Sequence, residues 1–377
     1  MHMADLYVVA QRHMQRRGMS LRALARAVGQ DPSYLSKALR GVKPCGPALA
    51  RSVDEALGAD GEVIRAASQS ETSPAIQKTS VAPELVGYFR AQLAGHYTAD
   101  MYLGPRHLIP IVQAQAELIT QLASNADAPV RRGLLDTGAA YAALLGWLYQ
   151  DAGDLTASAR WRDITLSLAH RSGDPQLISY ALTNKAMLAL DQGDGRAVVD
   201  YAQAALAGER GLSPKARVLA LQHQAHGHAM LGRRDAADRL LDAAAALAGQ
   251  VDDGYLWGNA CRRTPHYVAV QRATCYGRTG RAADAADAAA LWDQVMDEMP
   301  ESARRDNAVF RTRQAAALAV VPDPERVVSL AADAAQVVRT TGSARLQREL
   351  KALTARSARW GQTPAGRELR AIVASVA

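Results

Sequence analysis

The chain has 377 residues, 49% of them hydrophobic but with only 2 Phe and 5 Trp, and its formal net charge is +7. Alanine is abundant, which favours helices packed on helices and excludes a β-sandwich or barrel, since those need rows of β-branched and aromatic residues. No apolar run approaches the ~20 residues of a membrane span, and the N-terminus lacks a signal-peptide core, so we expect a soluble, cytoplasmic protein of about two to three domains.

The positive charge is concentrated at the N-terminus. Residues 1–70 contain 10 Lys and Arg against 6 Asp and Glu, so less than a fifth of the chain carries +4 of the net +7. This asymmetry favours a small nucleic-acid-binding module ahead of a larger, nearly neutral body.

Five helices are predicted in this basic segment, over residues 4–17, 21–28, 32–40, 46–57 and 61–67. Ser20 is a suitable N-cap for the second helix, and Gly29 provides the turn that follows it. Asp31 is positioned to cap the third helix, with Pro32 at its first position. The second and third helices together predict a two-helix unit.

The sequence SLRALARAVGQDPSYLSKALRG (residues 20–41) resembles the helix-turn-helix of the XRE (lambda-repressor-like) family of bacterial DNA-binding proteins. The resemblance covers about residues 4–68, so a DNA-binding domain is expected over 1–68. It implies that the third helix enters the major groove. Ser33 and Lys37 would then face base edges, and phosphates would be contacted by Arg22, Tyr34, Arg40 and Lys43. The alternative is a small helical bundle that does not bind DNA.

Residues 69–83 are rich in Ser, Thr, Gln and Pro and predict a linker, and residues 84–377 predict one helix after another. Four helix–turn–helix units turn at glycines spaced 39 to 48 residues apart, namely Gly153, Gly193, Gly232 and Gly280. Weaker units flank them, and a capping helix is expected over 344–356. Each pair would be buried by its neighbours, as in an α-solenoid.

The local pattern resembles the tetratricopeptide repeat (TPR), with Leu145-Gly146 and Tyr149 on a first helix and Gly153 at the turn. The family's small residue on the second helix corresponds to Ser158, Val198, Ala237 and Ala285. We expect five or six units with a concave groove. The candidate ligand-binding residues in this groove are Arg106, Trp147, Asn184, Lys185, His223, Asn259 and Arg263.

Asn184 and Asn259 are candidates because an amide both donates to and accepts from a peptide backbone. The alternative interpretation places Trp147, Trp161 and Trp257 in the core between repeats and leaves the arginines facing solvent.

This combination of domains resembles the ligand-responsive regulators of Gram-positive bacteria known as the RRNPP group. The resemblance implies a homodimer bound to a double-stranded DNA operator and controlled by a peptide or small-molecule effector, as in quorum sensing. The alternative is a regulator whose repeats bind a protein partner instead.

Motifs for catalysis or cofactor binding are missing from the sequence. It has no GxxxxGK[ST], HExxH or GxSxG, and its cysteines, Cys45, Cys261 and Cys275, form no CxxC. His223, His226 and His228 lack a neighbouring Cys or acid to complete a metal site. We therefore expect no enzyme, cofactor or metal; an enzyme or toxin-system component with an autoregulatory N-terminus is the less favoured reading.

Overall fold

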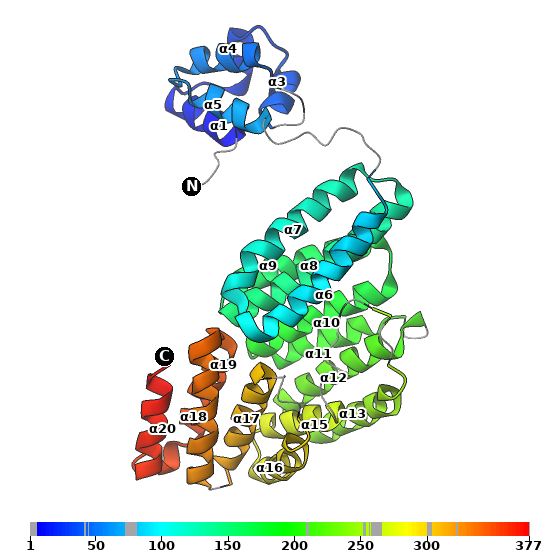
Figure 1. The fold of residues 1–377 in the computed structure, drawn as a ribbon, viewed down its shortest axis with the longest axis vertical. Helices are drawn as coiled ribbons and strands as arrows, with labels where there is room; N and C mark the ends of the chain where they lie inside the picture. The colour runs from blue at the N-terminus through cyan, green and yellow to red at the C-terminus, as the bar shows by residue number, and fades with distance from the viewer. Residues whose placement is uncertain are drawn as a thin grey trace. The chain divides into compact units, whose positions relative to one another are not determined.

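The computed structural model describes residues 6–40, 43, 45–71, 81–208, 211–251, 254–255, 257, 266–299, 304–321 and 323–376. Across these residues the chain is all-helical, as its composition predicts. The chain divides into two compact units, Met1–Thr79 and Ser80–Ala377, and each is described by itself (Figure 1).

The first unit contains five helices, which are α1 (Leu6–Arg16), α2 (Leu21–Ala27), α3 (Pro32–Leu39), α4 (Pro47–Leu57) and α5 (Glu62–Glu71). Its core is built from fully buried aliphatic side chains such as Leu24, Leu35 and Val53. The helix ends agree with the sequence prediction to within about two residues, except that α5 runs four residues beyond the predicted 61–67.

The second unit begins with the long helices α6 (Glu84–Leu103), α7 (Pro105–Asn125), α8 (Ala128–Ala152) and α9 (Leu155–Ser172). It continues with α10 (Pro175–Asp191), α11 (Gly195–Ala205), α12 (Pro214–Met230), α13 (Arg234–Ala248), α15 (Tyr267–Arg278) and α16 (Ala282–Met296). The C-terminal part consists of α17 (Arg304–Leu318), α18 (Pro324–Thr341), α19 (Ala344–Arg356) and α20 (Pro364–Ala374). The capping helix predicted over 344–356 is present, but α20 follows it, which the sequence analysis did not anticipate.

The four predicted turn glycines all lie between paired helices. Gly153, Gly193, Gly232 and Gly280 have φ angles of 91°, 77°, 72° and 78°, a left-handed conformation that only glycine adopts without strain. The small residues predicted on the second helices, including Ser158 and Ala237, are buried against their first helices. Successive pairs pack side by side along the chain (Figure 1).

The two ends of the second unit also touch each other. Arg305 on α17 donates to the main-chain oxygen of Asp100 on α6 at 2.7 Å, although the two residues are 205 positions apart. Nearby, the hydroxyl of Ser343 donates to the carboxylate of Asp151 at 2.5 Å, which ties the start of α19 to the end of α8. The row of helices thus folds back on itself within this unit.

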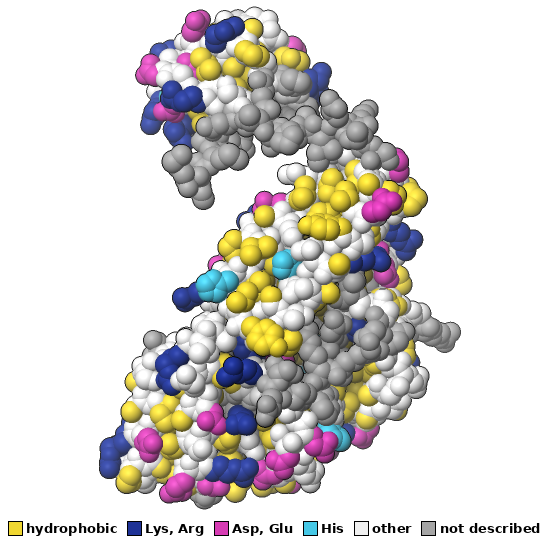
Figure 2. Space-filling model, viewed as in Figure 1, with side chains coloured by type: hydrophobic (Ala, Val, Ile, Leu, Met, Phe, Trp, Pro, Cys, Tyr) yellow, Lys and Arg dark blue, Asp and Glu magenta, His cyan; other side chains and the backbone are white. Residues whose placement is uncertain are grey.

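Several hydrophobic side chains are exposed along α6 and α7 (Figure 2). They are Tyr88, Tyr102, Leu103, Ile111 and Leu118. Among the described helices, none has both the length and the apolar character needed to cross a membrane.

Candidate functional site

The first unit holds α3 in place by local capping. The Asp31 carboxylate accepts the main-chain N–H groups of Ser33 at 2.9 Å and Tyr34 at 3.0 Å, and Pro32 occupies the first turn. At the start of α2, Ser20 caps that helix by accepting the N–H of Ala23 at 3.2 Å. Buried Leu24 and Leu35 fix the two helices against the core, so the outer face of α3 is presented rigidly.

That outer face carries the polar side chains predicted to bind DNA. Ser33, Lys37 and Arg40 are exposed, and Tyr34 is half-buried. The Lys43 ammonium lies 5.4 Å from the ring centroid of Tyr34, close enough for a cation–π contact. Five of the six predicted residues therefore lie on α3 or directly after it, and the sixth, Arg22, lies on α2.

The cations of this surface are uncompensated. Arg22, Lys37, Arg40 and Lys43 are all exposed, and none of them forms an ion pair with an acid in the described part of the chain. Exposed, unpaired cations are what phosphate binding requires, because their charge is free to replace the counterions of a nucleic acid.

Residues 9–67 match a protein-family model described as a helix-turn-helix domain. The first unit is a helix-turn-helix domain. A search of curated proteins finds no match to the chain. A helix-turn-helix domain suggests a DNA-binding regulator, with α2 and α3 as the two helices of the motif.

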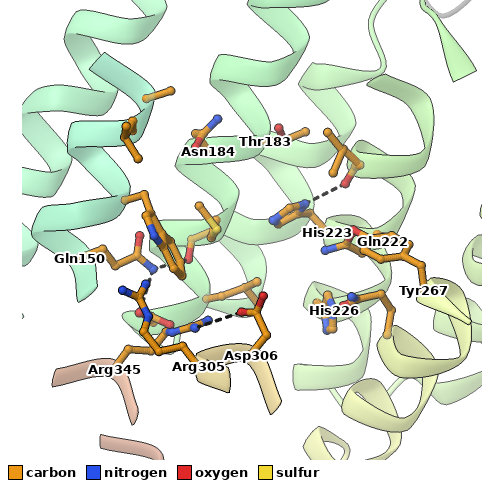
Figure 3. A pocket seen from close by; sticks show the side chains of 18 of the residues that line it. Gln150, Thr183, Asn184, Gln222, His223, His226, Tyr267, Arg305, Asp306 and Arg345 are labelled. Carbon is orange, nitrogen blue, oxygen red and sulfur yellow. Dashed lines mark hydrogen bonds and ion pairs between the residues drawn. The ribbon is translucent and has the colours of Figure 1, made fainter. Parts of the chain in front are cut away.

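The second unit contains a partly open cavity of about 290 Å³. Its lining comes from α6, α8, α10, α12, α15 and α17, which are the first helices of successive pairs, together with Arg345 of α19. Gln150, Asn184, His223 and Arg305 point into the same space from four different helices (Figure 3). The first helices therefore form the inner wall of the unit.

Three of the predicted ligand-binding residues, Trp147, Asn184 and His223, line this cavity. Lys185 is turned away and forms an ion pair with Asp163. Arg106 is exposed and is not part of the lining. Asn259 and Arg263 lie outside the described residues.

Trp161 and Trp257 differ in role from Trp147. Trp257 is buried and stacks on Tyr180, with ring centroids 4.4 Å apart, and Trp161 packs partly buried against the same core cluster. These two rings contribute to packing, whereas Trp147 faces the cavity.

The side-chain amide of Asn184 already forms two hydrogen bonds within the protein. Its oxygen accepts from the fully buried guanidinium of Arg162 at 2.8 Å, and its nitrogen donates to the main-chain oxygen of Tyr180 at 2.8 Å. Arg162 also donates to the side-chain oxygen of Gln150. Burial lowers the pKa of Arg162 to about 10. Asn184 is thereby fixed in position and keeps one N–H and one lone pair for a ligand.

Two histidines present neutral rings to the cavity. Nδ1 of His223 lies 2.8 Å from the main-chain oxygen of Leu219, so it carries the proton, and Nε2 is left as an acceptor. Burial lowers the pKa of His223 to about 4. His226 accepts from Arg278 at Nδ1, at 2.8 Å, and its pKa is also lowered by burial.

An ion-pair cluster closes one side of the cavity. It consists of Asp100, Asp151, Asp306, Arg305 and Arg345. Arg305 binds both oxygens of Asp100, at 2.9 and 3.1 Å, and approaches the fully buried Asp151 to 3.4 Å.

Trp147 is held against this cluster. Its indole N–H donates to the carboxylate of Asp100 at 3.1 Å, and the guanidinium of Arg345 lies 4.5 Å from its ring centroid. The sequence analysis missed Asp100, Gln150, Arg305 and Arg345. The one signal available was local: Gln150 and Asp151 directly follow the apolar run 138–149 of the same helix.

Within the described residues, no group of three or more His, Cys, Asp or Glu side chains is arranged to hold a metal ion. Cys275 lies 3.3 Å from Nδ1 of His226, but burial raises the pKa of its thiol to about 12. It therefore remains a protonated thiol at neutral pH.

Proposed function

We propose that the protein is a cytoplasmic transcriptional regulator, not an enzyme, whose second unit is a TPR-like solenoid that binds a peptide or small-molecule effector. The observation that carries the effector role is the cavity walled by the first helix of each pair, with Trp147, Asn184 and His223 in its lining. The DNA-binding role rests on the helix-turn-helix domain and its exposed cations.

The proposed DNA contacts divide into two kinds. Ser33 and Lys37 reach base edges from the exposed face of α3, and Lys37 pairs with the acceptors of guanine. Arg22, Tyr34, Arg40 and Lys43 bind phosphates and fix the register. The protein acts as a homodimer, because helix-turn-helix domains commonly bind two half-sites about one helical turn apart.

The cavity favours a small effector over a folded protein partner. About 290 Å³ is at the lower end of the range for small-molecule sites, and the lining combines aromatic surface with a few fixed polar groups. The neutral His223 acceptor and the remaining donor of Asn184 are suited to the amide groups of a short peptide or a metabolite.

The ion-pair cluster is the part of the second unit whose contacts an effector would change. It joins helices that are far apart in the sequence of the second unit. Trp147, which lines the cavity, donates to Asp100 of this cluster and lies against Arg345. A ligand that displaces or stabilises Trp147 changes the balance between closed and open forms of this unit. In a dimer, that change alters the spacing of the DNA-binding domains and so the operator affinity.

The DNA-binding half of the proposal is tested by a gel-shift titration on sites selected from genomic DNA. Lys37→Ala should weaken specific binding at least tenfold while leaving non-specific binding within about threefold. Arg40→Ala should weaken both and reduce the salt slope by about 1. Arg65→Ala, which removes an exposed cation of α5, is the control. Unchanged affinity in both α3 variants would refute the proposed placement of α3 on DNA.

The sensing half is tested with small molecules released by denaturing protein purified from its native cells. The released fraction should change the operator affinity of the wild-type chain. Trp147→Ala should lose that response at unchanged basal DNA affinity. A stoichiometric protein that co-purifies, with no active small molecule, would favour a protein partner and refute this half.

A further inference from the structure

A second cavity, of about 270 Å³, adjoins the first. It is lined mainly by α15, α17 and α19 and by the end of α10. Five side chains line both cavities: Leu190, Asp191, Arg278, Arg313 and Arg345. Three arginines thus stand at the junction between the two spaces.

The lining of the second cavity has an excess of positive charge. Its cations are Arg278, Arg313, Arg345, Arg348 and Arg356, and its acids are Asp191 and Glu349.

Both acids are already bonded. Asp191 accepts from Arg348 at 2.7 Å and from Gln150 at 2.8 Å, and Glu349 accepts from Arg313 at 3.1 Å. The carboxylates of the lining therefore leave part of the arginine charge uncompensated.

Arg278 stands at the junction without a carboxylate partner in the described part of the chain. Among the described residues it forms no ion pair, and its guanidinium donates to Nδ1 of the neutral His226. Burial and the charge of Arg313 lower its pKa to about 10, so it stays charged at neutral pH. Arg278 is half-buried, so its guanidinium is partly shielded from water and has no carboxylate partner among the described residues. An oxyanion that matches the fork geometry of a guanidinium compensates such a charge well.

We propose that the effector carries an oxyanion, a carboxylate or a phosphate, which binds at the junction of the two cavities against Arg278 and Arg313. Its uncharged part then extends into the first cavity towards Trp147. This assignment rests on the proposed effector role of the first cavity, and it adds the charge and the orientation of the ligand.

Arg356 forms the outer edge of the same site. Its side chain is exposed and donates to the main-chain oxygen of Gly277 at 2.9 Å, so it lies next to the last turn of α15. An anion at the junction would be held by α15, α17 and α19 together. Binding would therefore link helices that belong to different pairs, which is the property required of an effector site.

The test uses the full chain and three probes of similar size, benzoate, phenyl phosphate and the neutral benzamide, at constant ionic strength. Dissociation constants are measured by ligand-observed NMR. At least one anion should bind ten or more times more tightly than benzamide, and the tighter of the two indicates whether the natural group is a carboxylate or a phosphate. Arg278→Gln should abolish this preference, Arg356→Gln should reduce it, and Arg160→Gln, at an exposed site on α9, should preserve it.

The proposal is overturned if no anion binds, if benzamide binds as tightly as the anions, or if the preference survives in both cavity variants. If Arg278→Gln does not fold, as judged by tryptophan fluorescence, the result for Arg356→Gln decides. Failure of this inference is distinct from failure of the proposed function. A gel-shift response to the released small molecules, without any anion preference, leaves effector sensing intact and removes only the oxyanion.

Discussion

The two units use arginine in opposite ways. In the helix-turn-helix domain, Arg22 and Arg40 are exposed and unpaired with acids of the described chain. In the second unit, Arg162 and Arg305 are buried and bonded on several sides. In one unit the arginine side chain therefore offers its charge to an external polyanion. In the other unit it connects neighbouring helices through hydrogen bonds and ion pairs. Burial and partners, rather than residue type, decide which role it has.

From this comparison we expect the largest loss of stability when Arg305 is replaced. Arg305→Ala leaves Asp100 and Asp151 buried without their main cation, which should cost about 3–5 kcal/mol of stability. All 5 tryptophans of the chain lie in the second unit, so fluorescence during urea unfolding reports on that unit alone. Arg160→Ala, at an exposed site, is the control. A loss below about 1 kcal/mol would mean that the ion-pair cluster does not hold the ends of the unit together.

The second prediction concerns acid. Folding holds the pKa of His223 near 4, below the ordinary 6.5, so the stability that depends on its neutral form is fully present above pH 6.5 and is lost as the pH falls towards 4. The loss for one such histidine is about 1.4 kcal/mol per pH unit. His223→Gln should make the decline in stability between pH 6.5 and 4.5 correspondingly shallower, whereas His107→Gln, at an exposed position, should not. Equal slopes in all three proteins would contradict a buried neutral His223.

The third prediction concerns the local order of the DNA-binding surface. Asp31→Ala removes the acceptor of two main-chain N–H groups at the start of α3, which should cost about 1 kcal/mol. Hydrogen exchange measured by mass spectrometry should show faster exchange in α3, with the second unit unaffected. Asp31→Asn keeps an oxygen acceptor and should restore most of the protection. Faster exchange throughout the chain would show that the effect is not local.

The smallest effect on stability is expected at Arg40. Arg40→Ala removes an exposed side chain without an acid partner, so the stability of the helix-turn-helix domain should change by no more than about 0.5 kcal/mol. Hydrogen exchange of the same domain measures this change. Together with the predicted loss of DNA affinity, it would show a residue kept for binding alone. A destabilisation similar to that at Arg305 would remove the contrast between the two units.

The DNA-binding unit was largely predictable because its determinants are local. Asp31 and Pro32 specify the start of α3, Gly29 the turn before it, and the spacing of Leu24 and Leu35 the buried face. Each of these acts within a few residues along the chain. The outer face of α3 therefore followed from the sequence, and the DNA contacts assigned to it stay a prediction.

The cavity was predictable only in part. Asn184 and His223 could be assigned to its wall because the repeat pattern separates first helices from second helices, and the first helices face inward. Lys185 is adjacent to Asn184 in sequence but points to Asp163, because neighbouring positions on a helix lie about 100° apart. The Asn184 amide oxygen accepts a hydrogen bond from Arg162. The local sequence does not indicate that Arg162, unlike its neighbours, is a buried cation.

By itself, the sequence determined the helical class, the capped helices of the DNA-binding motif and the glycine turns that separate the pairs. Each of these follows from the conformational preferences of a few adjacent residues. The tertiary structure alone decided the closure of Arg305 on Asp100 and the gathering of arginines at the junction of the cavities. Contacts between residues some 205 positions apart depend on how every intervening pair packs, and small angular differences between pairs accumulate along the row.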